Sequence, residues 1–161
     1  MSTSNFQLDT NEPLDASDMR IGIVVAEWNK QITDKLLEGA LSELQKYGAK
    51  EQSINVMHVP GSFELIYGCA EMARSGLVDA IIAIGCIIKG ETPHFDYICQ
   101  GVTQELAKQN SAGRVPVIYG VLTVNTLEQA ESRCGGKYGN KGCEYALSAI
   151  KMINFARELK N

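Results

Sequence analysis

Three stretches of the sequence are almost continuously apolar, and they constrain the fold more than any other feature. They read IGIVVA at residues 21–26, AIIAIGCII at 80–88 and VPVIYGVL at 115–122. Such runs are typical of strands that are buried on both faces, as in parallel sheets that helices cover on both sides. We therefore predict that these three runs form the centre of a parallel sheet.

A fourth run, SINVMHV at residues 53–59, has a different pattern. Ile54, Val56 and His58 are expected on one side, and Ser53, Asn55 and Met57 on the other. This alternation is typical of an edge strand. We expect His58 to be packed in the core, in register with the two apolar residues.

Between the strands, apolar residues repeat at helical spacing, and glycines mark several ends. The predicted helices cover residues 32–47, 63–74, 93–109, 127–134 and about 141–159. Strands that alternate with helices indicate an α/β protein with right-handed crossovers. The predicted fold is a flavodoxin-like three-layer α/β/α sandwich, whose four-stranded parallel sheet has the order 2-1-3-4. In such sheets ligands bind at the carboxyl ends of the strands, here between the first and third strands.

Length and charge narrow the function. The 161 residues suit one domain, and 15 Lys and Arg against 19 Asp and Glu give a net charge of −4, which argues against a nucleic-acid partner. No apolar stretch approaches the roughly 20 residues that cross a bilayer, so we expect no membrane association. Residues 1–18 are polar and contain no Lys or Arg, so they resemble a flexible arm rather than a secretory signal, and residues 19–161 form the predicted single domain.

The cysteines and histidines show no metal-binding spacing. The five cysteines are Cys69, Cys86, Cys99, Cys134 and Cys143, and no two of them form a C-x-x-C pair. Neither histidine lies at a spacing from them that a zinc site requires. An odd number of scattered thiols suits a reducing compartment, so we expect a cytoplasmic protein without a metal.

Candidate ligand-binding residues follow the first and second strands. Trp28, the single tryptophan, lies just past residue 26, where it is either a half-buried loop aromatic or a stacking surface for a flat ring. The sequence VPGSFE at 59–64 contains a turn, and Ser62 is a candidate cap for the next helix.

The segment GETPHFDY at residues 90–97 follows the third strand. Thr92 is a natural N-cap and Pro93 a natural first helical residue, so the helix start offers unpaired N–H groups to an anion. The charge of Glu91 opposes this unless its side chain points away. Because the positive end of the helix dipole disfavours imidazolium, His94 is well placed as a neutral base for proton transfer.

Two cations flank a glycine-rich turn near the end of the chain. Arg133 precedes this turn and Lys141 follows it. Arginine can hold a phosphate through two N–H groups, but solvated surface charge is the default interpretation of both residues.

Taken together, Trp28 and four longer motifs resemble the family of 6,7-dimethyl-8-ribityllumazine synthases in order and spacing. The motifs are VPGSFE, GCIIKGETPHFDY, VPVIYGVLT and ESRCGGKYGNKGCE. The resemblance extends over residues 20–159, nearly the whole chain. It implies condensation of 5-amino-6-(D-ribitylamino)uracil with 3,4-dihydroxy-2-butanone 4-phosphate in riboflavin biosynthesis, with no cofactor.

The resemblance also implies roles for single residues. His94 would transfer protons and Arg133 would hold the phosphate. Contacts to the ribitylaminouracil would come from Trp28, Ser62, Phe63, Glu64, Cys86, Ile87, Ile88 and Tyr119, the last lent by a neighbouring subunit. Contacts to the butanone phosphate would come from Glu91, Thr92, Arg133 and Lys141. This sequence departs from the family at Trp28, where many relatives carry phenylalanine, and at Cys86, where a small hydroxyl residue is common.

Members of the family form pentamers with active sites between subunits, and many assemble into an icosahedral 60-subunit shell. The short turn at residues 135–142 resembles the shell-forming type, so we expect a 60-mer, with riboflavin synthase as a candidate partner. The competing interpretation is a non-catalytic relative that binds flavin or lumazine, or that only forms a shell. A receiver domain of the same fold is set aside, because Gly85 and Cys86 occupy the place where it needs an aspartate.

Overall fold

A computed structural model describes residues 14–160. Its central sheet is parallel and has the order β2-β1-β3-β4, which confirms the predicted fold class and strand order. The strands are β1 (Ile21–Ala26), β2 (Ile54–Val59), β3 (Ala80–Ile88) and β4 (Val117–Val124).

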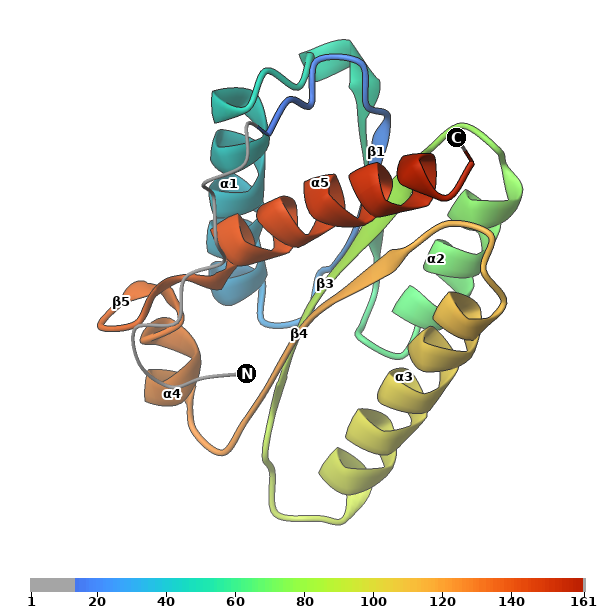
Figure 1. Ribbon diagram of the computed structural model, residues 1–161. Coiled ribbons are helices and arrows are strands. Elements are labelled where there is room, and N and C mark those ends of the chain that lie inside the picture. Colours follow the sequence, from blue (N-terminus) through green and yellow to red (C-terminus); the bar gives the residue numbers. More distant parts are fainter. Residues whose placement is uncertain (1–13, 161) are drawn as a thin grey trace.

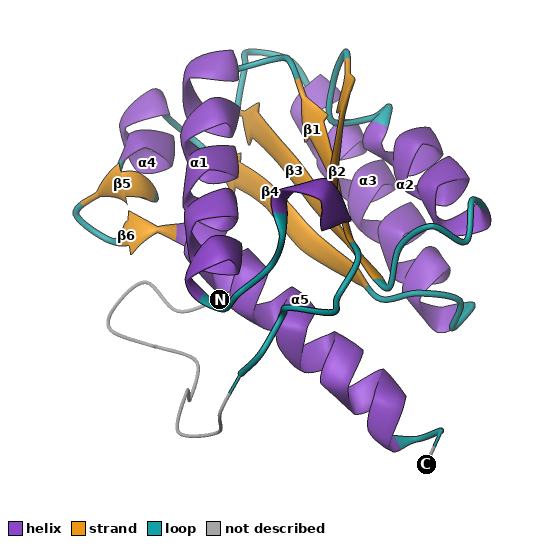
Figure 2. Cartoon of the chain, turned by 90° about the horizontal axis from the view of Figure 1, so that it is seen from above, coloured by secondary structure: helices purple, strands orange, loops and turns teal. Residues whose placement is uncertain are grey.

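Helices cover both faces of this sheet, so the described part of the chain has three layers (Figures 1 and 2). One face carries α1 (Lys30–Lys46) and α5 (Lys141–Glu158), and the other carries α2 (Leu65–Arg74) and α3 (His94–Ser111). The shorter elements are η1 (Glu51–Ser53), α4 (Leu127–Glu131), β5 (Cys134–Gly136) and β6 (Gly139–Asn140).

The two faces of the sheet bury separate apolar clusters, because successive strand residues point to opposite faces. In β3, Ile82 and Ile84 pack with α1 and α5, whereas Ile81 and Ala83 pack with α2 and α3. All four side chains are inaccessible to solvent. Each fully buried isoleucine contributes about 1.5–3 kcal/mol through the hydrophobic effect, which explains why a continuous apolar run becomes the central strand.

Several predicted boundaries shift by a few residues. β4 begins at Val117, two residues after the predicted start, because Pro116 has no N–H group to donate to the ladder. The Pro116 carbonyl still accepts a bond from the Ile81 N–H at 2.9 Å. α4 ends at Glu131 rather than 134, because Cys134 already pairs in the small β5–β6 sheet.

The prediction that His58 is a packed core histidine is wrong. Ile54 and Val56 are half-buried against the core as expected, but His58 is exposed. β2 is an edge strand, and α1 packs over β1 and β3 rather than over β2. The alternation therefore identified the correct face of the strand, but none of the described helices covers that face at its carboxyl end.

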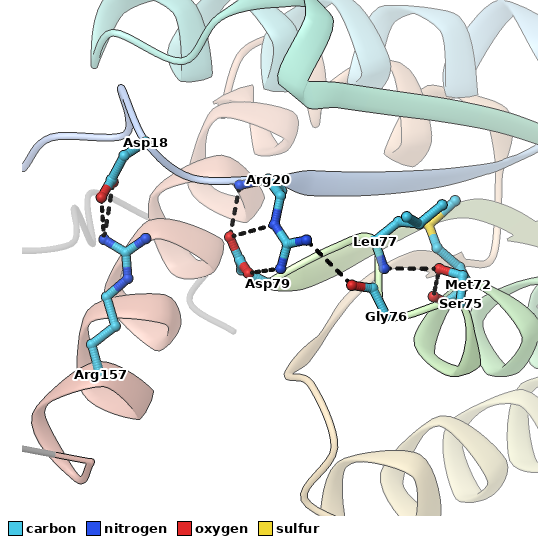
Figure 3. Close-up of polar contacts among 8 residues, drawn as sticks. All are labelled: Asp18, Arg20, Met72, Ser75, Gly76, Leu77, Asp79 and Arg157. Atoms are coloured by element: carbon cyan, nitrogen blue, oxygen red, sulfur yellow. Dashed lines mark hydrogen bonds and ion pairs between the residues drawn. The ribbon is translucent and has the colours of Figure 1, made fainter.

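Part of the predicted N-terminal arm is packed against the domain. Ala16 is completely buried, and its N–H donates to the Tyr47 carbonyl at 2.8 Å. Asp18 forms an ion pair with Arg157 at 3.0 Å, as Figure 3 shows. The packed domain thus begins before the predicted boundary at residue 19, while residues 1–13 of the predicted arm lie outside the described residues.

Within residues 14–160, no helix has the length and apolar character that crossing a membrane requires.

Candidate active site

The connections that follow β1, β2 and β3 surround a cavity of about 630 Å³ at the carboxyl end of the sheet. This is the switch point between β1 and β3, where the prediction placed a ligand. A volume of this size suits a small organic ligand. Among the predicted site residues, the cavity is lined by Trp28, Ser62, Phe63, Glu64, Cys86, Ile87, Ile88, Thr92 and His94.

Trp28 lies on the β1–α1 connection with 72% of its surface exposed. Its ring is therefore not half-buried within one chain, and the stacking role stays a prediction. The connection is held toward β2 by the Glu27 N–H, which donates to the Val59 carbonyl at 2.9 Å, and by the Trp28 N–H, which donates to the Pro60 carbonyl at 3.1 Å. An exposed aromatic face is thus presented to the cavity from a tethered backbone.

Ser62 is buried on the β2–α2 connection and lies against Gly85 of β3. A Cβ atom at Gly85 would come within 2.7 Å of the Ser62 Oγ, so a side chain at this position would force Ser62 to shift. Ser62 does not cap α2 with its side chain, contrary to the prediction. The cap position is Glu64, which has no side-chain cap bond, and α2 begins at Leu65 rather than at residue 63.

The start of α3 forms another wall of the cavity. The helix begins at His94, the cap position is Pro93, and no side chain caps it, so the prediction of Thr92 as a cap is wrong. Thr92 and His94 nevertheless both line the cavity. Glu91 is exposed and is not among the lining residues. In the first turn of α3, the Asp96 and Tyr97 N–H groups donate to the Pro93 carbonyl. The N–H groups of His94 and Phe95, the first two helical residues, are left without an intrahelical acceptor, and both residues line the cavity.

Cys86 lines the cavity, and its buried thiol belongs to the apolar cluster on the α1 and α5 face of the sheet. Burial raises the pKa of the Cys86 thiol to about 12, with a further increase from Cys134. The thiol therefore remains protonated near neutral pH, which does not favour a nucleophilic role.

Some lining residues were missed by sequence reasoning, namely Asn29, Phe95 and Ile98. Phe95 and Ile98 are one helical turn apart on α3, and this spacing could have identified them beside His94. For Asn29 the sequence signal is weak: a polar residue directly after the strand-end tryptophan.

Other predicted site residues lie away from this cavity. The Tyr119 hydroxyl is 2.9 Å from Thr103 Oγ1, and burial raises the pKa of Tyr119. Lys141 is buried and paired with Glu144.

Arg133 also lies outside the lining of the cavity. Its Nη1 donates to the Gln129 carbonyl at 2.8 Å, and its guanidinium lies 5.0 Å from the centre of the Tyr138 ring. The β5 segment next to it contacts α1, on the face opposite to α2 and α3. Within one chain, the predicted phosphate arginine and the predicted proton-transfer histidine are thus not brought together.

Among the described residues, 14–160, no group of three His, Cys, Asp or Glu side chains could hold a metal ion.

The fold and the cavity together define a flavodoxin-like α/β protein with a ligand-sized cavity at its topological switch point. The chain belongs to the 6,7-dimethyl-8-ribityllumazine synthase family, whose model matches residues 18–157. Proteins of that name from several bacteria are similar over most of their length. The chain is 57% identical to one from Phocaeicola vulgatus over 94% of this chain and 90% of the relative. It is 60% identical to one from Bacteroides fragilis, over 88% of this chain and 99% of the relative. It is 54% identical to one from Parabacteroides distasonis, over 93% of this chain and 94% of the relative. The family recognised from the motifs is therefore confirmed.

Proposed function

We propose that this chain is a transferase that condenses 5-amino-6-(D-ribitylamino)uracil with 3,4-dihydroxy-2-butanone 4-phosphate. The products are 6,7-dimethyl-8-ribityllumazine, phosphate and water. The observation that carries this proposal is the cavity itself, because residues from three separate connections meet there in a chain that matches the family over residues 18–157. Trp28 offers a flat apolar surface for the pyrimidine, and the open start of α3 offers N–H groups to an anion.

The chemistry requires proton transfers and the departure of phosphate. The uracil amine attacks the ketone to give a carbinolamine and then an imine; phosphate leaves, and the ring closes with loss of water. His94, at the first position of α3, is the group proposed to move protons. Holding the two substrates against each other supplies much of the rate. No covalent enzyme intermediate is needed, which agrees with the protonated Cys86 thiol.

We propose that the site is completed by a neighbouring subunit. Arg133, Tyr119 and Lys141 do not line the cavity of their own chain, which supports a role for these positions in the cavity of another copy. β4 supports this proposal, because among residues 14–160 it pairs with β3 alone and no strand lies on its other edge. The assembly proposed is a pentamer that forms a 60-subunit shell.

We also propose a cytoplasmic location. Supporting it, all five cysteines are free, and Cys69, Cys86 and Cys134 are buried as small apolar side chains.

The activity is tested by mixing the purified protein with both substrates and following lumazine absorbance and fluorescence. We expect product to form well above the slow uncatalysed reaction. Product formation at the uncatalysed rate would contradict the enzymatic proposal and favour a binding or shell-forming role.

The ranking of the two catalytic residues is tested by comparing Arg133→Ala with His94→Ala. We expect His94→Ala to lower the rate about 10²–10⁴-fold, because water can replace a proton shuttle in part. Arg133→Ala should cost more, because the phosphate loses its clamp. Arg114→Ala is the matched control, since Arg114 is an exposed arginine just before β4 at the other end of the sheet. Equal losses from His94→Ala and Arg133→Ala would show that the roles are ranked wrongly.

The assembly is tested by light scattering at neutral pH. A 60-mer should have a mass of about 1 MDa, whereas a species near 90 kDa, the mass of about five 17.6-kDa chains, would contradict the shell.

A further inference from the structure

Asn29 has an unusual backbone conformation directly beside Trp28. Among residues 14–160 it is the one non-glycine residue with a positive φ, at 59°. Asparagine tolerates the left-handed region better than most residues, because its short polar side chain can form local hydrogen bonds. The conformation turns the chain sharply between the end of β1 and the start of α1.

The side chain of Asn29 does not stabilise its own helix. Asn29 occupies the N-cap position of α1, where asparagine normally accepts a bond from an N–H of the first turn, but no such bond exists. Its backbone carbonyl accepts from Ile32 at 2.8 Å and from Thr33 at 3.1 Å. The side-chain Nδ2 donates instead to the Cys86 carbonyl of β3, at 2.8 Å.

This bond crosses the switch point of the sheet. The β1–β3 ladder ends at the Val25–Ile84 pair, whereas β3 continues to Ile88 beside β4. The Asn29 amide therefore donates to β3 beyond the point where β1 has ended. The other two bonds of this connection, from Glu27 and Trp28, go to the β2 side. Asn29 thus ties the Trp28 segment to the opposite wall of the cavity, and both Asn29 and Cys86 line that cavity.

We propose that Asn29 is a positioning residue that sets the distance between the Trp28 ring and the backbone of residues 86–88. This inference rests on the proposed function. It states that the Asn29–Cys86 bond fixes, before any ligand binds, the part of the site that receives the pyrimidine ring. A ring that must touch both Trp28 and β3 binds well only if their spacing is held before binding. The phosphate substrate does not depend on this spacing.

Because Trp28 is the single tryptophan, the fluorescence of the whole protein reports on this position. Asn29→Gly keeps a positive φ without strain and removes the donor. Asn29→Asp keeps the size and the tolerance of this conformation, but places a carboxylate oxygen against the Cys86 carbonyl. The matched control is Asn110→Ala, since Asn110 also bonds backbone across two elements, to the N–H and carbonyl of Val117, at the amino end of β4.

Two measurements on the assembled protein test the inference. In the first, without ligand, both Asn29 variants should show lower Trp28 anisotropy and stronger quenching by acrylamide, and Asn110→Ala should match the unaltered protein. In the second, the KM for the ribitylaminouracil should rise about 3- to 10-fold, the effect of one lost hydrogen bond, with kcat and the KM for the butanone phosphate nearly unchanged.

Each contrary result has a distinct meaning. Unaltered Trp28 anisotropy in both Asn29 variants would overturn the inference, and so would equal changes in Asn110→Ala, which would indicate general loosening. A relaxed Trp28 without any change in KM would remove the link to binding. If the unaltered protein formed no lumazine, the proposed function would fail, while the ligand-free fluorescence would still decide whether Asn29 positions Trp28.

Discussion

At the amino end of the sheet charged side chains pair with one another, whereas at the carboxyl end large apolar side chains face an open cavity. Before β1, Arg20 binds Asp79 at 2.6 Å and the Gly76 carbonyl at 3.2 Å, and Asp18 binds Arg157 (Figure 3). At the other end, Trp28 and Phe63 are 72% and 52% exposed. One end of the same sheet has its polar groups satisfied within the chain, and the other leaves apolar surface for a ligand or another subunit to cover.

This contrast teaches that stability and function are separated along the strands. Substitutions at the amino end should change the free energy of unfolding without changing the reaction. Substitutions at the carboxyl end should change the reaction without changing the free energy of unfolding.

Among the variants that compare the two ends of the sheet, Trp28→Ala should have the largest effect, which is on substrate binding. Loss of the stacking surface should raise the KM for the ribitylaminouracil about 10- to 100-fold, because stacking on an aromatic ring contributes about 1–3 kcal/mol. Since the ring is mostly exposed, the urea midpoint should hardly change. Trp28→Phe is the control and should stay within about threefold of the unaltered protein. A large loss of stability in Trp28→Ala would contradict the proposal that the carboxyl end of the sheet serves binding rather than stability.

A smaller effect is expected from Asp79→Asn, which weakens the amino end. Burial alone would raise the pKa of Asp79, but hydrogen bonds from the Arg20 side chain and N–H, with their charge attraction, lower it overall. The ion pair should stabilise the fold only modestly at neutral pH, because Arg20 is half-exposed and solvent screens its charge. Steady-state kinetics should be unchanged.

The pH dependence of this difference has a definite sign. A carboxyl whose pKa is lowered by folding adds stability above its unfolded pKa, about 3.9, and loses it as the pH falls through the folded value. Urea midpoints of the two proteins should therefore differ from neutral pH down to about pH 5 and converge below about pH 4. A difference that persists at lower pH would show that the carboxylate charge is not its source.

The smallest expected effect is a slight gain in stability from Tyr145→Phe. Tyr145 of α5 is buried, its hydroxyl has no hydrogen-bond partner within the described residues, and burial raises its pKa. Removing an unsatisfied buried hydroxyl should be neutral or stabilising by up to about 1 kcal/mol. Tyr119→Phe is the comparison, because it loses a bond to Thr103 and should be less stable than the unaltered chain. A clear loss in Tyr145→Phe would show that its hydroxyl is satisfied in solution.

Much of the architecture could be predicted, because a strand that is buried on both faces of the sheet has an almost continuously apolar sequence. The runs at 21–26 and 80–88 became β1 and β3 with their predicted bounds. The position of the cavity followed from the strand order. The exposure of His58 could not be predicted, because alternation reveals a strand's face but not how far a neighbouring helix covers it.

For the candidate site residues too, the sequence predicted some features correctly and others wrongly. Trp28, Ser62 and His94 were identified because they follow strands or open helices, and all line one cavity. The capping roles expected for Ser62 and Thr92 are absent, since the chain enters α2 and α3 through turns that place other residues at the cap positions.

The sequence by itself determined the parallel sheet, its helical layers and the family, because apolar periodicity and motif order are properties of neighbouring residues along one chain. Only the tertiary structure decided which distant groups meet. The Asn29 amide reaches Cys86 across 57 positions, and Arg133 lies away from the cavity of its own chain. Such contacts depend on where one strand ends beside another, and that relation between strands is set by packing in three dimensions.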